Sequence, residues 1–249
     1  MRQAALRQRS GHRLCVTACT LALAAGAATT PGAGTPTPIP TAEYGPAPSG
    51  ATLHQYRALR RMHALSEKSH HEGWMDAWTE FDSGGFRYQI VAERGSGTVR
   101  NKVLRAMLKR EQELIANGDF GRGELTTENY EFGADTSGPG VRYVTIKPRR
   151  KDVMLIDGRM VMSANGELLR VEGRLAKNPS FWTSQVDVTR HYARVDGVRV
   201  PIATESVAKV RFAGRSRLNI RYEYESINGR PVRMAAVPGT AAISLAFGR

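Results

Sequence analysis

A small group of histidine and glutamate residues is the first place where this sequence offers metal-binding side chains. His70, His71 and Glu72 are consecutive, and His63 lies seven residues before His70. On a helix this spacing places His63 and His70 roughly 10 Å apart along the axis, whereas zinc ligands lie about 2 Å from the metal. The H-E-x-x-H spacing of a helical zinc site is absent from the sequence. We therefore predict a solvated helix end here and no metal site.

A glycine-containing segment offers a second kind of chemistry, because glycine-rich turns between a strand and a helix often bind phosphate. Residues 95–98 read Gly-Ser-Gly-Thr, but Arg100 stands where a G-x-G-x-x-G motif has its third glycine. Neither G-x-x-x-x-G-K-[ST] nor the nucleophile pattern G-x-S-x-G occurs in the sequence. We predict a turn in which Thr98 caps the following helix. The chain is predicted not to be an enzyme and to use no cofactor.

The loop Asn178-Pro-Ser-Phe-Trp182 is a further candidate for a ligand contact. Its proline cannot donate a ladder hydrogen bond, so the preceding strand is predicted to end before it. Two aromatic residues, Phe181 and Trp182, follow at once. Two interpretations stay open for them: they plug one end of a curved sheet, or they gate a ligand.

A long run of predicted strands must position these residues. Between residues 166 and 227 apolar and charged side chains alternate, as in residues 217–225, Arg-Leu-Asn-Ile-Arg-Tyr-Glu-Tyr-Glu. Such alternation places one set of side chains on each face of a strand. Turn dipeptides predict hairpins at Asp157-Gly158, Asn165-Gly166 and Asp196-Gly197, and Asn228-Gly229 is predicted to end the last strand. Further strands are predicted at 86–92, 129–132, 141–147 and 153–156. The pattern predicts a large antiparallel sheet with one apolar and one charged face.

Two segments are predicted to be amphipathic helices, and the apolar face must be covered either by helices or by a ligand. The first is residues 53–72, with an apolar stripe through Tyr56, Leu59, Met62 and Leu65. The second is residues 99–116, which carry apolar residues on one side and Lys and Arg on the other. Gly118 suits the left-handed position after its end.

The first fifty residues are predicted to direct and tether the chain. Residues 1–27 have four arginines, then a short apolar run, then Ala25-Gly26-Ala27, the pattern of a cleaved signal peptide. We therefore expect export to the periplasm; a lipid anchor at Cys19, in Val-Thr-Ala-Cys, is the less favoured alternative. Residues 28–50 are rich in Pro, Thr and Gly and are predicted to be a disordered tether. Residues 51–249 are predicted to be a single domain, with its core at about 74–228.

The chain is strongly basic, with 36 Lys and Arg against 23 Asp and Glu. Without the four leader arginines the balance is 36 − 4 = 32 against 23, a net charge of +9. The signal-peptide pattern of residues 1–27 predicts export, which argues against nucleic acid as the partner. The arginines are spread along the strands near acidic residues, which favours cross-strand ion pairs on a solvated face. Attraction to anionic lipid headgroups is the second interpretation.

Two runs in the predicted sheet carry a family resemblance. They are residues 166–182, Gly-Glu-Leu-Leu-Arg-Val-Glu-Gly-Arg-Leu-Ala-Lys-Asn-Pro-Ser-Phe-Trp, and residues 190–201, Arg-His-Tyr-Ala-Arg-Val-Asp-Gly-Val-Arg-Val-Pro. Together they resemble bacterial exported proteins related to the LolA-type outer-membrane lipoprotein carriers, whose fold the RseB-type periplasmic sensors share. The resemblance covers roughly 74–228 and implies a half-barrel with helices across its open side. It further implies an apolar cavity for acyl chains and no catalytic residues.

The predicted fold class is α+β, mainly β: a strongly curved antiparallel half-barrel sheet with helices covering the concave face. The predicted function is an exported lipid- or lipoprotein-binding, carrier-like protein, with acyl chains as ligands and a membrane surface or an envelope protein as a further partner. Its candidate cavity residues are Val171, Leu175, Trp182, Val186, Val188, Val210, Leu218, Ile220, Tyr222, Val103 and Met107. Three alternatives stay open: these residues form an ordinary core with no room for ligand, the domain is an envelope-stress sensor that binds a partner protein, or it is a hydrolase with a scattered site.

Overall fold

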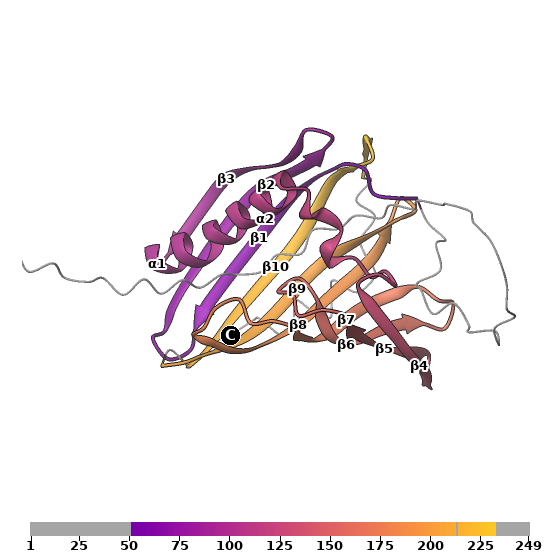
Figure 1. The fold of residues 1–249 in the computed structure, drawn as a ribbon. Helices are drawn as coiled ribbons and strands as arrows, with labels where there is room; N and C mark the ends of the chain where they lie inside the picture. Colours follow the sequence, from indigo (N-terminus) through magenta and orange to yellow (C-terminus); the bar gives the residue numbers. More distant parts are fainter. Residues whose placement is uncertain (1–50, 213, 233–249) are drawn as a thin grey trace, which may run out of the picture.

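The computed structural model describes residues 51–212 and 214–232 of the 249-residue chain. The predicted signal peptide at 1–27, the tether at 28–50 and the end of the predicted domain lie outside the described residues. Within them the protein is mainly β, with one large antiparallel sheet and one helical segment (Figure 1). The prediction of a large antiparallel sheet is confirmed.

Consecutive strands of the sheet are mostly neighbours in space. The order across the sheet is β3-β2-β1-β10-β9-β8-β7-β6-β5-β4, and β11 pairs with β10. The strands are β1 (Tyr56–Ser66), β2 (His71–Asp82), β3 (Gly85–Gly95), β4 (Tyr130–Gly138), β5 (Val141–Pro148), β6 (Ile156–Ser163), β7 (Leu168–Leu175), β8 (Thr183–Val195), β9 (Val198–Val210), β10 (Gly214–Ile227) and β11 (Arg230–Pro231). The described part of the chain therefore forms its first strand, β1, inside the sheet and reaches one edge with β3. It re-enters at the opposite edge with β4 and meanders back until β10 pairs with β1. The two outermost strands, β3 and β4, are not neighbours, so the sheet is open.

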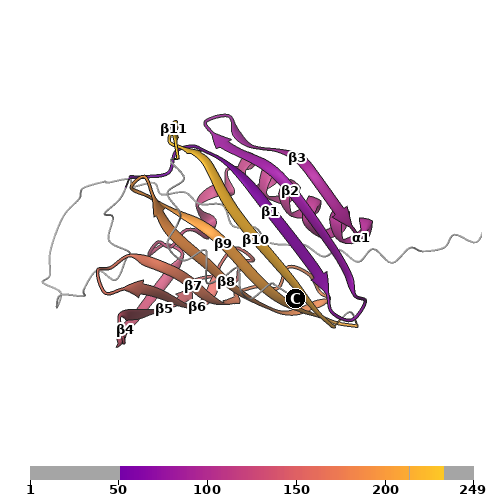
Figure 2. The same cartoon turned by 180° about the vertical axis from the view of Figure 1, so that it is seen from behind.

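The helical segment joins these two edges. It consists of α1 (Gly97–Val99), η1 (Arg100–Arg105, a π-helical stretch), α2 (Ala106–Ala116) and the short 3-10 helix η2 (Asp119–Gly123). The segment packs on one face of β1, β2 and β3, in front of them in Figure 1 and behind them in Figure 2. The helix predicted at 99–116 is confirmed, and Gly118 has the predicted left-handed φ of 75°. The N-cap is Ser96 rather than Thr98, and no side-chain cap bond forms there.

The predicted helix at 53–72 is wrong, because β1 and the start of β2 occupy this segment. Along β1 the buried positions recur with a period of two, at Ala58, Arg60, Met62 and Ala64. The strand pattern was obscured because one of its inward residues is an arginine and two are small alanines. Tyr56, Leu59, Met62 and Leu65, read as a helical stripe, instead alternate between the two faces of a strand.

The predicted hairpins at Asn165-Gly166 and Asp196-Gly197 are confirmed, each with its glycine at positive φ. Asn228-Gly229 follows the end of β10, and the short strand β11 comes after it. The hairpin predicted at Asp157-Gly158 is wrong, because β6 runs straight through both residues. Gly158 is there for a different reason. It pairs with Gly173 of β7, and a Cβ at Gly158 would lie 2.1 Å from the carbonyl oxygen of Glu172.

Candidate ligand-binding face

The apolar residues of the alternating strands form one face of the sheet, here called the apolar face; the opposite face is the charged face. One row of paired residues crosses the apolar face from β2 to β6. In order across the sheet, its members are Met75, Met62, Ile220, Thr204, Arg190, Val171 and Met160. Five of the seven are apolar, whereas Arg190 and Thr204, on the neighbouring strands β8 and β9, are polar.

On one half of the apolar face, side chains of the helix meet the sheet directly. Leu104, Met107 and Leu108 have 0% of their surface exposed and pack with Met62 and Met75. Four of the other candidate cavity residues belong to this cluster: Val103, Leu218, Ile220 and Tyr222. The prediction placed a ligand space here, but in the structure these residues act as the contact between helix and sheet.

The other half of the apolar face carries a second cluster, on strands β4 to β8. It contains four candidate residues, all buried: Val171, Leu175, Val186 and Val188. Val210 is also buried, at the end of β9. Trp182 is not brought together with them, because it lies in the loop before β8 with 37% of its surface exposed. Nine of the eleven candidate residues therefore fall into two separate clusters, and Val210 and Trp182 belong to neither.

Arg190 is the most unusual side chain on the apolar face. It is only 5% exposed, and it donates a hydrogen bond to the Tyr192 hydroxyl, with Tyr222 and Tyr130 close by. Burial alone lowers the pKa of Arg190, but these tyrosines raise it above its usual range, so the guanidinium stays charged. Across the described residues, the structure pairs this buried cation with no carboxylate.

A buried hydroxyl without a hydrogen-bond partner lies beside Arg190. Thr204 pairs directly with it across β8 and β9, is buried, and its Oγ1 lacks a hydrogen-bond partner. A buried hydroxyl without a partner costs about 1–3 kcal/mol, and a buried charge without a counter-charge costs more. A cation and a hydroxyl on adjacent strands are together suited to bind an anionic oxygen.

Arg60 shows how the same face neutralises a buried cation elsewhere. Its guanidinium donates to Glu111 of α2 at 2.5 and 2.9 Å and to the Tyr56 hydroxyl at 2.7 Å. Both side chains of the ion pair are 3% exposed. Burial lowers the pKa of Arg60, but Glu111 raises it well above the usual value. The contrast marks Arg190 as the buried arginine without a protein counter-charge.

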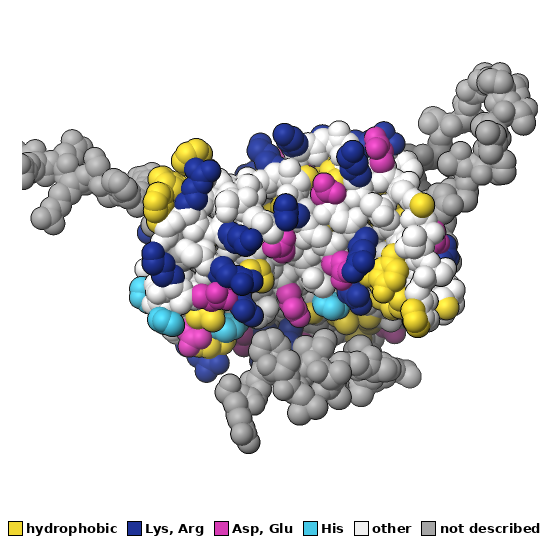
Figure 3. Space-filling model, turned by 90° about the horizontal axis from the view of Figure 1, so that it is seen from below, with side chains coloured by type: hydrophobic (Ala, Val, Ile, Leu, Met, Phe, Trp, Pro, Cys, Tyr) yellow, Lys and Arg dark blue, Asp and Glu magenta, His cyan; other side chains and the backbone are white. Residues whose placement is uncertain are grey.

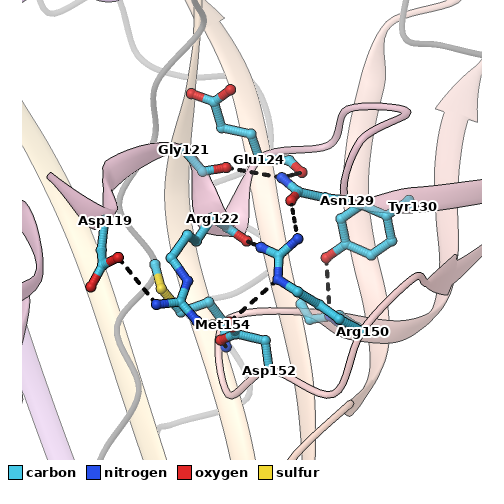
Figure 4. Close-up of polar contacts among 10 residues, drawn as sticks. Asp119, Gly121, Arg122, Glu124, Asn129, Tyr130, Arg150, Asp152 and Met154 are labelled. Atoms are coloured by element: carbon cyan, nitrogen blue, oxygen red, sulfur yellow. Dashed lines mark hydrogen bonds and ion pairs between the residues drawn. The ribbon is translucent and has the colours of Figure 1, made fainter.

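Tyr130, which lies close to Arg190, is part of a group of polar contacts at the start of β4. Figure 4 shows these contacts. The Tyr130 hydroxyl accepts a hydrogen bond from the Ile156 N–H at 3.0 Å, and burial raises the pKa of Tyr130 to about 12, so the hydroxyl is neutral near pH 7. Around it, Asn129 donates to two backbone carbonyls at 2.9 Å and accepts from Arg150 at 2.7 Å. Arg122 binds Asp152 at 2.7 Å. The chain between η2 and β4 is thus held against the loop that precedes β6.

The charged face carries the cross-strand ion pairs that the sequence predicted. Examples are Arg61–Glu223 at 2.7 Å and Arg159–Glu172 at 2.5 Å. Positive and negative side chains are interspersed on the side of the molecule seen in Figure 3. Two open hollows, of about 510 and 460 Å³, are lined mainly by residues of this face, among them Asp187 and Glu205 in one and His63 and Trp74 in the other. In the second hollow His63 stacks on Trp74 at 4.6 Å.

The residues that sequence reasoning missed are Arg190 and Thr204. A signal for Arg190 was present: it continues the even-numbered apolar phase of Val186 and Val188, where a charged residue is unexpected. Thr204 gave no such signal, because threonine is common in strands. In the described part of the chain, no three His, Cys, Asp or Glu residues are grouped so as to hold a metal.

No model of a known protein family matches this sequence, and no curated protein matches it at a significant level. Among the described residues, none of the helices is long and apolar enough to cross a membrane.

Proposed function

We propose that this chain is an exported, carrier-like protein that binds lipids or lipoproteins on the apolar face of its sheet. Support comes from an open antiparallel sheet with one mainly apolar face and from the signal-peptide pattern of residues 1–27. In this proposal the sheet is a strongly curved half-barrel. The helical segment covers one half of its concave face, and the ligand is bound on the other half.

The observation that carries the proposal is the buried guanidinium of Arg190 without a carboxylate partner. An anionic headgroup supplies the missing counter-charge, and the adjacent Thr204 hydroxyl donates to it. The acyl chain lies along Val171, Val186 and Val188, where each buried methylene contributes about 0.8 kcal/mol. The hydroxyl groups of the three tyrosines around Arg190 add polar contacts to this site.

The test is native mass spectrometry and lipid extraction of the full chain purified from a bacterial envelope. We expect acyl-bearing anionic species to co-purify with the protein. The variant Arg190→Met should lose them, whereas Arg174→Met, on the neighbouring strand but exposed and on the charged face, should retain them. A wild-type protein that is empty on purification and cannot be loaded with a detergent-solubilised anionic phospholipid contradicts the proposal.

A second candidate function is an envelope sensor that binds a partner protein. It is favoured by the outer strand β3, which pairs with β2 and, from Val91 to Gly95, is exposed. Such an edge accepts an added strand from another chain. An empty domain that captures an envelope protein, and loses it when Val91 is replaced by proline, supports this function instead.

A further inference from the structure

Three aromatic side chains are exposed together at one end of the sheet. Phe181 is 75% exposed, Phe212 is 83% exposed and Trp182 is 37% exposed. Their rings form a continuous group, with centroid distances of 5.4 Å from Phe181 to Trp182 and 6.1 Å from Trp182 to Phe212. We call these three residues the aromatic tip. They come from two different connections, the loop before β8 and the turn after β9, so the group exists only in the folded protein.

The backbone holds the aromatic tip in place. The Arg211 N–H donates to the carbonyl oxygen of Trp182 at 2.7 Å, which joins the two connections. Phe212 has a left-handed φ of 66°, a costly conformation for a bulky residue. Lys68, from the turn after β1, donates to the Phe212 carbonyl oxygen at 2.9 Å. Three turns are thus linked by hydrogen bonds around three exposed rings. Burial of apolar surface normally drives folding, so it does not account for rings that are held in contact with solvent.

The same three turns are strongly basic. Residues 66–71, 175–183 and 210–215 contain four Lys and Arg, namely Lys68, Lys177, Arg211 and Arg215, and one acidic residue, Glu67. Glu67 is already neutralised by Arg217 at 2.7 Å. The Arg211 guanidinium lies over the Phe181 ring at 4.9 Å, which places a cation at the margin of the aromatic tip.

We propose that the aromatic tip inserts into the surface of an anionic phospholipid bilayer. Tryptophan and phenylalanine with surrounding Lys and Arg are suited to the headgroup region, where rings meet the acyl boundary and cations meet anionic headgroups. The charge of the surrounding turns favours this partner over a neutral apolar one. The inference is independent of the ligand proposed for Arg190, because the tip lies on the outer surface and uses none of the residues of that site.

The test follows the tryptophan fluorescence of the full chain with vesicles of phosphatidylcholine, with and without phosphatidylglycerol, that contain brominated acyl chains. Bromine quenches tryptophan only at short range, and because the chain also contains Trp74 and Trp78, the part of the quenching that is lost in Trp182→Phe reports the tip. We expect quenching with the anionic vesicles, and we expect Trp182→Phe to abolish it. Quenching that is equal in wild type and Trp182→Phe overturns the proposal.

Binding variants provide a second, separate readout. The double variant Phe181→Ser/Phe212→Ser should weaken partitioning onto anionic vesicles about tenfold or more, since two large apolar side chains no longer leave water. Val91→Ser, an exposed apolar residue of β3, is the matched control and should leave it unchanged. Lys177→Glu should weaken binding, most strongly at low salt, whereas Arg230→Glu, beyond the opposite end of β10, should have little effect. Equal partitioning by the double variant and the control contradicts insertion and leaves a protein partner as the use of this surface.

Discussion

Arg60 of β1 and Glu111 of α2 form a buried ion pair, with two hydrogen bonds of 2.5 and 2.9 Å between the guanidinium and the carboxylate. The pair lies in the contact between helix and sheet, with the Arg60 guanidinium also over the rings of Phe86 and Tyr222 at 5.1 Å each. It is therefore a buried polar attachment of the helical segment within a largely apolar contact. Because both charges are desolvated, each depends on the other.

Removal of one partner of this pair should be strongly destabilising. We expect Arg60→Met and Glu111→Gln each to lower the free energy of unfolding by about 3–5 kcal/mol, since a buried charge or polar group is left without its partner. The double variant Arg60→Met/Glu111→Leu should be more stable than either single variant, because it leaves no buried charge. Urea denaturation of the three variants measures this. Additive losses in the double variant would contradict the coupling.

Arg190 should behave in the opposite way. Replacement by methionine removes a buried cation that no protein carboxylate neutralises, so we expect Arg190→Met to keep or raise the free energy of unfolding of the lipid-free protein, by up to about 2 kcal/mol. Thermal and urea unfolding of delipidated wild type and variant provide the measurement. A loss of several kcal/mol would mean that the tyrosines around Arg190 satisfy it fully, and the argument for an anionic ligand would fail.

Glu124, which follows η2, should make stability depend on pH. Burial, with a smaller contribution from Glu128, raises the pKa of Glu124 to about 7, above an ordinary value of 4.5. The protonated form of Glu124 is thus favoured in the folded state. Its contribution to the free energy of unfolding is therefore fully present below pH 4.5 and is lost as the pH rises through 7. Glu124→Gln should gain stability over wild type across this window, by about 1 kcal/mol after allowance for solvent screening. Unfolding free energies from pH 4 to 9 test this; a constant difference contradicts it.

Gly158 should tolerate no side chain, because β6 and β7 approach each other too closely there. An added Cβ would lie 2.1 Å from the Glu172 carbonyl oxygen and 2.6 Å from the Gly173 Cα. Both neighbours are backbone atoms, so the strands must separate. We expect Gly158→Ala to lower the unfolding free energy by about 3 kcal/mol or more.

Gly97→Ala in the helical segment is the control for this prediction. An added Cβ there meets only the end of the Arg100 side chain, at 3.7 Å. Its stability should be unchanged or increased by about 1 kcal/mol. Equal effects of the two substitutions in urea unfolding would contradict the close approach at Gly158.

Much of the sheet could be predicted because, in most of its strands, successive side chains alternate between polar residues that face water and apolar residues that face the core. Segments 141–147 and 217–225 have this form, and both are strands. The prediction failed where an inward position carries an unexpected residue. At β1 the inward Arg60 hid the strand, since its counter-charge comes from a helix 51 residues away. In β6, Gly158 allows the backbones of β6 and β7 to approach closely. The sequence pattern had predicted a turn at this glycine.

The candidate site was predicted only in part. The apolar members followed from periodicity, because burial of one face fixes which phase of a strand is apolar. Their division into two clusters did not, since it depends on which half of the face the helix covers. The exposed position of Trp182 likewise depends on how two distant connections meet.

The amino-acid sequence by itself determined a basic chain with a large antiparallel sheet, one apolar face and a helix at 99–116, because these properties arise from local periodicity and turn chemistry. Only the tertiary structure decided that β10 pairs with β1, that Arg60 is neutralised while Arg190 is not, and that Phe181, Trp182 and Phe212 share one surface. Each of these depends on residues far apart in the chain, and no local pattern encodes which distant partners meet.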